Sequence, residues 1–405
     1  MSACVPKIRF SDFSDNWRLR PIDEILDLSV SPIKMSDEAT YSLITVRRGN
    51  GGIDRRNFSE GIKVLVKSQF LVETNDFVIS KRQIVHQACG LVPEELNGSI
   101  VSNEYNVFKP STDANIIYFD YFCKRPEMKH QFYLSSVGVH LEKMLFKTND
   151  WLKRRFYFPT LPEQTKIADF LTSVDKRIEY LTQKKSLLEQ YKKGAMQQLF
   201  TQAIRFKDDD GNDFPDWEEK KLGDIANFTS SKRVHLSEYV EKGIPFYRGK
   251  EISELKQNKT PEEILYISEE LYSHFKEKYG VPKIGDILIT AVGTLGNVLR
   301  INHSEPFYFK DGNLIWVQNL SECSLFFEYL LEVKHRDILK SSIGSNQRAL
   351  TMIELRKLSF NFPTLPEQTK IADFLTAIDS KIESVANQIT ETQTFKKGLL
   401  QQMFV

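Results

Sequence analysis

The residues of this sequence that could take part in chemistry do not have the spacing of a known catalytic motif. The G-x-x-x-x-G-K-[ST] phosphate loop is absent, and so is a D/N-P-P-Y/F tetrad that would position an adenine amino group. Gly293 and Gly296 are too close together to cradle a nucleotide and are more typical of a plain turn. The histidines lack the H-E-x-x-H spacing of a zinc site. The charges between Asp76 and Lys81 match a nuclease pattern no better than ordinary solvated surface does.

Other polar side chains have the types that DNA reading requires. Arg and Lys bind guanine or phosphate, and Asn and Gln match the edge of adenine. Each of these residues taken singly is more often solvated surface, but as a set they favour DNA contacts. The candidates in the first half of the chain are Arg47, Arg48, Asn50, Arg55, Arg56, Lys81, Arg82, Gln83, His86 and Gln87. The candidates in the second half are Arg248, Lys250, Thr294, Asn297, Asn346, Gln347 and Arg348.

An internal repeat organises the elements that must position these residues. Residues 158–172 read Phe-Pro-Thr-Leu-Pro-Glu-Gln-Thr-Lys-Ile-Ala-Asp-Phe-Leu-Thr, and residues 362–376 repeat them letter for letter. The likeness continues to Lys192-Lys193-Gly194 and Lys396-Lys397-Gly398, and Ile8-Arg9-Phe10 returns as Ile204-Arg205-Phe206. Repetition over this length indicates two half-proteins in tandem.

The repeated segment predicts a long helix. Apolar residues recur at a spacing of alternately four and three, the seam of a coiled coil, and Lys192 and Lys396 interrupt it. Thr160 with Glu163 and Thr364 with Glu367 have the spacing of capping boxes at the helix starts. Roughly 40 residues correspond to a spacer of about 60 Å. The two helices of one chain are expected to pair antiparallel, although a coiled coil that joins two copies of the protein is an alternative.

Two matching glycines, Gly194 and Gly398, lie inside these expected helices. They indicate either close packing of the helices or a broken helix end.

The segments before each helix predict α+β heads. Short strands are expected at 40–46, 77–80 and 100–101 in the first, and at 284–290 and 313–317 in the second. Helical stretches are expected near 117–135 and 324–341. The predicted domains are 1–160, a spacer helix 161–203, a second head 204–363 and a second spacer helix 364–405.

Composition limits the class of protein further. The net charge is only +1, so any DNA-binding surface must be a patch of separated basic residues rather than a basic coat. The 4 cysteines are far apart and form no C-x-x-C pair, which favours neither a zinc site nor a disulfide framework and fits a reducing cytoplasm. No apolar run approaches the ~18 residues that a membrane span needs.

Specific motifs resemble the specificity subunits of Type I restriction-modification systems. They are the doubled segment at 158–172 with Asp175 and its copy with Asp379, the strand-like 285–289 before 293–296, and the turn-like 344–348. The first half departs from the pattern, with Asn75-Asp76-Phe77-Val78-Ile79 for the strand and Ser136-Val137-Gly138-Val139 for the turn.

The resemblance implies an α+β protein with two target-recognition domains in tandem pseudo-repeat, separated by two long helices that form an antiparallel coiled coil. Each domain would read one half of a bipartite site in double-stranded DNA, and the helices would fix the gap. The resemblance also implies that two modification subunits, which use S-adenosylmethionine, bind near the helix starts. Two restriction subunits would use ATP and Mg²⁺, and this chain would hold no cofactor or metal. The residues for partner binding would be Pro162, Glu163, Gln164, Pro366, Glu367 and Gln368.

Three alternatives remain at this point. One is a coiled-coil scaffold without DNA specificity, and another is a fused or stand-alone DNA nuclease or methyltransferase. The third is a specificity subunit that serves a methylation-only system.

Overall fold

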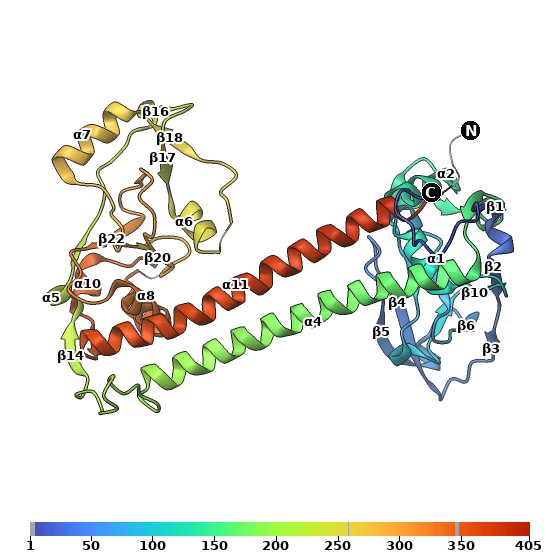
Figure 1. Cartoon of the computed structure of the whole chain (residues 1–405), viewed down its shortest axis with the longest axis horizontal. Coiled ribbons are helices and arrows are strands. Elements are labelled where there is room, and N and C mark those ends of the chain that lie inside the picture. Colours follow the sequence, from blue (N-terminus) through green and yellow to red (C-terminus); the bar gives the residue numbers. More distant parts are fainter. Residues whose placement is uncertain (1–4, 258, 345–347) are drawn as a thin grey trace. The chain divides into compact units, whose positions relative to one another are not determined.

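The computed structural model describes residues 5–257, 259–344 and 348–405. The chain divides into two compact units. Unit 1 comprises residues up to 183 together with 385–405, and unit 2 comprises residues 184–384. Two long helices, α4 (Leu161–Phe200) and α11 (Leu365–Gln402), each contribute one half to unit 1 and the other half to unit 2 (Figure 1).

Unit 1 is built on two main sheets. The first is a four-stranded antiparallel sheet in the order β2-β10-β7-β8, and the second is a five-stranded sheet in the order β3-β6-β9-β4-β5. A pair of β1 with β13 stands where the chain enters α4, and β11 pairs with β12. The strands are β1 (Arg18–Pro21), β2 (Leu26–Ser29), β3 (Pro32–Ile33), β4 (Thr40–Val46), β5 (Ile53–Glu60), β6 (Gln69–Leu71), β7 (Phe77–Ser80), β8 (Cys89–Leu91), β9 (Ile100–Ser102), β10 (Tyr105–Pro110), β11 (Ser136–Val137), β12 (Leu145–Phe146) and β13 (Arg155–Phe158).

The helices of unit 1 cover the four-stranded sheet and build an aromatic core. They are α1 (Ile116–Cys123), α2 (Pro126–Leu134) and α3 (Thr148–Leu152). The side chain of Asn115 caps α1 by accepting a hydrogen bond from the Tyr118 amide, and Pro126 begins α2 in the first turn, where its missing N–H costs nothing. Phe119 and Trp151 are fully buried in this core.

Unit 2 repeats the plan with a different second sheet. Its four-stranded sheet has the order β15-β22-β19-β20, and a second sheet has the order β16-β18-β17-β21. The strands are β14 (Glu218–Lys221), β15 (Asn227–Thr229), β16 (Tyr239–Val240), β17 (Ile244–Tyr247), β18 (Leu265–Ile267), β19 (Ile287–Thr290), β20 (Val298–Arg300), β21 (Tyr308–Phe309), β22 (Leu314–Gln318) and β23 (Ser359–Phe362). The helices are α5 (Leu222–Ile225), α6 (Gly249–Lys256), α7 (Glu269–Tyr279), α8 (Ser324–Val333), α9 (His335–Lys340) and α10 (Met352–Lys357).

Equivalent hydrogen bonds in the turns before β7 and β19 show that these two strands match each other in the two four-stranded sheets. The Asp76 carboxylate accepts from the Glu73 amide at 2.8 Å, and the Asp286 carboxylate accepts from the Lys283 amide at 2.9 Å. The preceding residues, Asn75 and Gly285, both have positive φ, at 67° and 93°. The predicted counterpart of the second-half strand is therefore confirmed in the first half, with Asn in the left-handed position that Gly occupies in the copy.

The expected strands and helices are confirmed, some with the predicted bounds and others with shifted ends. The strand expected at 284–290 begins only at Ile287, because residues 283–286 form the turn that Asp286 closes. The helical stretch near 117–135 is interrupted where α1 ends at Cys123 and α2 begins at Pro126. The α+β fold class is confirmed.

The long helices pair antiparallel within each unit. In unit 1 the beginning of α4 packs with the end of α11, and Leu171 and Leu399 lie in the same core. In unit 2 the end of α4 packs with the beginning of α11, and Leu199 and Leu375 lie in the same core. Each head is therefore completed by a helix end that belongs to the other half of the sequence.

Two details of these helices differ from expectation. A Cβ added at Gly194 would meet no atom within 4 Å, and α4 continues to Phe200, so neither close packing nor a broken end explains this glycine. The predicted capping box at Thr364 is wrong, because its Oγ1 has no hydrogen-bond partner. Glu367 instead accepts from Arg205 Nη2 at 2.8 Å.

Candidate DNA-recognition surfaces

Two loops of unit 1 meet through their main chains. The turn between β4 and β5 contacts the turn between β7 and β8, where the Gly49 amide donates to the His86 carbonyl at 2.7 Å. The Asn50 amide donates to the Gln87 carbonyl at 3.0 Å, and both of these residues have φ of 56°. The structure thus brings together the predicted residues Arg47, Arg48, Asn50, Lys81, Arg82, Gln83, His86 and Gln87.

The three arginines of these loops have acidic partners. Arg47 forms an ion pair with Asp54, and Arg82 Nε lies 2.9 Å from Glu104 Oε2. Arg48 Nη2 lies 2.6 Å from Glu142 Oε2. All three arginines remain exposed, so DNA could reach them, but phosphates would compete with carboxylates already in place.

Arg55 and Arg56 lie on β5, which leaves the same turn. Arg55 donates from Nε to Ser42 Oγ at 3.1 Å and from Nη2 to the Glu95 carbonyl at 2.8 Å. Its guanidinium also lies 4.7 Å from the centre of the Phe58 ring. Burial raises the pKa of Tyr105, and the charge of Arg56 partly opposes this shift. Both arginines are exposed, and these contacts hold the side chain of Arg55 in place.

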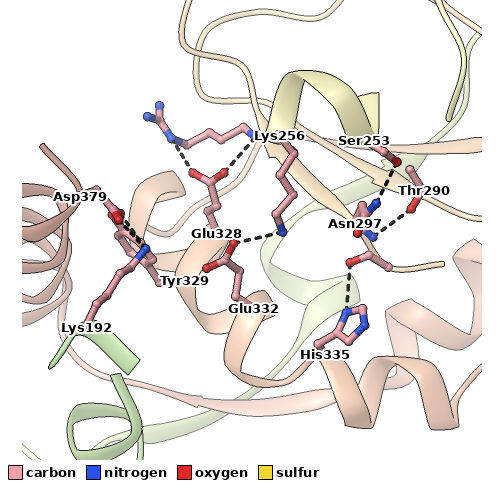
Figure 2. A network of polar contacts seen from close by, with 12 residues as sticks. Lys192, Ser253, Lys256, Thr290, Asn297, Glu328, Tyr329, Glu332, His335 and Asp379 are labelled. Atoms are coloured by element: carbon pink, nitrogen blue, oxygen red, sulfur yellow. Dashed lines mark hydrogen bonds and ion pairs between the residues drawn. The ribbon is translucent and has the colours of Figure 1, made fainter. Parts of the chain in front are cut away.

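The corresponding turn of unit 2, between β19 and β20, is held by a polar network (Figure 2). The Asn297 amide donates to Thr290 Oγ1 at 2.9 Å, and Asn297 Nδ2 donates to Ser253 Oγ of α6 at 2.8 Å. Nδ1 of His335, at the start of α9, lies 3.2 Å from the Gly296 carbonyl oxygen. The network fixes the side chain of Asn297, while Thr294 at the tip stays exposed.

Arg248 is paired with a buried carboxylate. Its main-chain amide donates to Glu251 Oε2 at 2.7 Å, and its Nη2 donates to Oε1 at 2.6 Å. Glu251 is fully buried at the start of α6. Burial raises the pKa of Glu251, but the hydrogen bonds from Arg248 outweigh it and hold the pKa below its usual range.

Lys250 and Arg348, which were also predicted to contact DNA in unit 2, are exposed. Lys250 Nζ lies 3.9 Å from Glu254 Oε1, and Arg348 Nη2 donates to the Leu339 carbonyl at 3.1 Å. The predicted residues Asn346 and Gln347 lie outside the described residues.

In each unit a further loop contacts the turn that follows β7 or β19. This loop lies between β11 and β12 in unit 1 and follows α9 in unit 2. The Phe146 amide donates to the Lys81 carbonyl in unit 1, and the Leu350 amide donates to the Ala291 carbonyl in unit 2, each at 3.0 Å. The pairing of β11 with β12 corresponds to the bridge between Ile343 and Ala349. The Gly138 turn is thereby confirmed as the counterpart of the Gly344 turn.

The residues predicted for partner binding have internal roles. Glu163 accepts from Arg9 Nε at 2.7 Å, and Gln164 Oε1 accepts from the Asn115 amide at 2.9 Å. The copies repeat this arrangement, because Glu367 binds Arg205 and Gln368 Oε1 accepts from the Cys323 amide at 2.9 Å. These four side chains are buried, whereas Pro162 and Pro366 are exposed.

Matching clusters between the long helices were missed by sequence reasoning. Lys396 forms an ion pair with Asp175, whose Oδ2 accepts from the Tyr121 hydroxyl at 2.7 Å. In unit 2, Lys192 Nζ lies 2.7 Å from Asp379 Oδ1, and Tyr329 donates to Asp379 Oδ2 at 2.7 Å. The signal was present in the sequence, because the aspartates repeat and the lysines interrupt the apolar seam.

In the described part of the chain, the His, Cys, Asp and Glu side chains form no group of three or more that could hold a metal ion. The helices of this part include none that is long and apolar enough to cross a membrane.

Two related units, each of which brings together turns with polar and basic side chains, have the organisation of a tandem DNA-recognition protein. The sequence matches the family described as Type I restriction modification DNA specificity domain over residues 15–190 and 215–393. The chain belongs to this family, and it is a DNA-recognition subunit rather than a catalytic one.

Known relatives agree with this assignment. A Haemophilus influenzae protein named as type I restriction enzyme specificity subunit S.HindORF215P is 34% identical over 172 residues, which are 42% of this chain and only 41% of that protein. The type I restriction enzyme MjaVIII specificity subunit of Methanocaldococcus jannaschii is 25% identical over 299 residues, 70% of this chain and 68% of the relative. The crystal structure of the Type-I restriction-modification system S subunit from M. genitalium has the same fold, with a TM-score of 0.58, 17% identity and 99% of each chain covered.

Proposed function

We propose that each unit reads one half of a bipartite DNA site and that the paired helices set the unread gap between the halves. The observation that carries this proposal is the repetition of the loop arrangement. In both units the turn that follows β7 or β19 contacts the loop at Gly138 or Gly344 through an equivalent main-chain hydrogen bond. Different side chains on one repeated frame suit two different half-sites.

The roles of individual residues follow from their surroundings. Arg47, Arg48, Arg56 and Arg82 are exposed and can exchange their carboxylate or solvent contacts for phosphates or guanine edges. Asn50 and Gln87 would present polar atoms from a fixed turn. In unit 2, Lys250, Thr294 and Arg348 are the exposed candidates, and Arg248 would act by holding the start of α6.

The chain would act within a larger complex in the cytoplasm. Two modification subunits that bind S-adenosylmethionine would dock on the helices, where Pro162 and Pro366 are exposed. Glu163 and Glu367 would support docking only indirectly, by fixing the helix starts. Two restriction subunits that use ATP and Mg²⁺ would complete a restricting complex, and a methylation-only complex would lack them.

Methylome sequencing tests this proposal. Cells that express the chain together with its modification subunit should acquire a methyl-adenine motif split by a fixed gap, and cells with the modification subunit alone should not. Exchange of one head should change one half of the motif and leave the other half and the gap unchanged. Unchanged methylation despite a verified complex would refute the proposal and favour the scaffold.

A further inference from the structure

The carboxylate of Glu142 contacts two turns of unit 1, the turn between β4 and β5 and the turn between β7 and β8. It lies in a 3₁₀ turn, Leu141–Lys143, within the loop between β11 and β12. Its Oε2 is 2.6 Å from Arg48 Nη2, and its Oε1 is 3.5 Å from Arg48 Nη1. Oε1 is also 3.1 Å from His86 Nε2. Three separate loops therefore meet at this one carboxylate.

Stability of the fold does not account for this arrangement. The Arg48 and Glu142 side chains are 53% and 59% exposed, and ion pairs in such surroundings contribute little to folding. The two guanidinium nitrogens face the two carboxylate oxygens, which aligns both groups more closely than a single contact would. The pair is thus an ordered, accessible element on the surface proposed to meet DNA.

The pair offers both kinds of hydrogen bond next to each other. A carboxylate can accept about four hydrogen bonds and a guanidinium can donate five, so both groups retain capacity after pairing. In the major groove a C·G pair presents the N4 amino donor of cytosine beside the O6 and N7 acceptors of guanine. Glutamate accepts from cytosine N4, and arginine donates to guanine. The pair is complementary to this base pair, and Glu142 would repel phosphates where no base contact compensates.

We propose that Glu142 is a specificity-determining residue of unit 1 and reads one C·G pair of its half-site together with Arg48. The His86 ring lies against the same carboxylate, with Nε2 3.1 Å from Oε1. This inference rests on the proposed function, because it requires that the loops of unit 1 meet a half-site.

The test uses the full chain in complex with its modification subunit. Glu142→Gln replaces an acceptor by an amide that suits adenine, so the methylated motif should become degenerate at one C·G position of the half-site read by unit 1. On duplexes with that pair substituted, discrimination should fall roughly tenfold or more. Arg48→Gln should relax the same position.

Glu73→Gln is a matched control. Glu73 Oε2 lies 2.6 Å from Lys109 Nζ, and the Glu73 side chain is 56% exposed, yet neither residue belongs to the predicted surface. This variant removes the same charge and should leave the motif unchanged. Equal melting temperatures of the variants and wild type would establish that each one folds.

The outcomes separate the two proposals. A wild-type complex without a bipartite motif would refute the proposed function. A bipartite wild-type motif that Glu142→Gln leaves intact would overturn the role of Glu142 alone. Relaxation at an A·T pair, or in the half-site of unit 2, would overturn it as well.

Discussion

The contact between Lys192 and Asp379 provides a quantitative test of the helix pairing. The two side chains are 19% and 39% exposed, and Asp379 also accepts a hydrogen bond from Tyr329. Hydrogen bonds to charged groups contribute about 1.5–3 kcal/mol, and the partial exposure of Asp379 places the expected loss at the lower end. Asp379→Asn should therefore reduce the free energy of opening of unit 2 by about 1.5 kcal/mol.

A double-mutant cycle isolates the pair from other effects of each substitution. Lys192→Met, Asp379→Asn and the double variant should give a coupling energy of about 1 kcal/mol. Because a two-unit protein need not unfold in one step, amide hydrogen exchange in each unit is the suitable measurement. Lys192→Met combined with Asp175→Asn is the control, because these residues lie about 25 Å apart along α4 and should be additive. A coupling for Lys192 and Asp379 no larger than that of the control would refute the reasoning.

Two further predictions concern single residues. Gly194→Ala should stabilise α4 by about 1 kcal/mol, because alanine favours helix and its Cβ would meet no atom within 4 Å. Amide hydrogen exchange of α4 would measure the change, and destabilisation would contradict the open surroundings of this site. Glu251→Gln should reduce the acid sensitivity of unit 2. Since the folded pKa of Glu251 is lowered, its stabilising contribution is present above the ordinary glutamate pKa and is lost as pH falls through the lowered value. Hydrogen exchange at neutral and acidic pH measures this, and an equal acid response of variant and wild type would contradict it.

Sequence patterns were sufficient for the frame of this protein. The letter-for-letter repeat and the apolar seam predicted both long helices and their antiparallel pairing, and β4 has the predicted bounds, Thr40–Val46. These features are local or periodic, so a single sequence contains them. The role of Arg248, in contrast, could not be predicted from the sequence. Its type suits DNA, but its role depends on Glu251 being buried beneath it.

Contacts between residues far apart in the sequence explain the remaining differences between the predicted roles and the structure. Arg48 and Glu142 are 94 positions apart, and no periodicity relates them. Glu163 has the spacing of a capping residue, yet Arg9 from the beginning of the chain takes its carboxylate at 2.7 Å. Tertiary partners decide such roles, because a charged donor competes better for a carboxylate than a main-chain amide does.

The construction of unit 1 limits how its head can be exchanged. The ring of Phe404 lies 5.2 Å from that of Tyr118, and Arg125 Nη1 donates to the Val405 carbonyl at 2.6 Å. The residues that follow α11 therefore pack on α1 and on Arg125 before α2, although they belong to the second repeat. Residues 115–125 form part of the shared frame and should be retained when the recognition loops are replaced. An exchange that also replaces this segment would leave Phe404 without its partner, and it would confuse a loss of folding with a change of specificity.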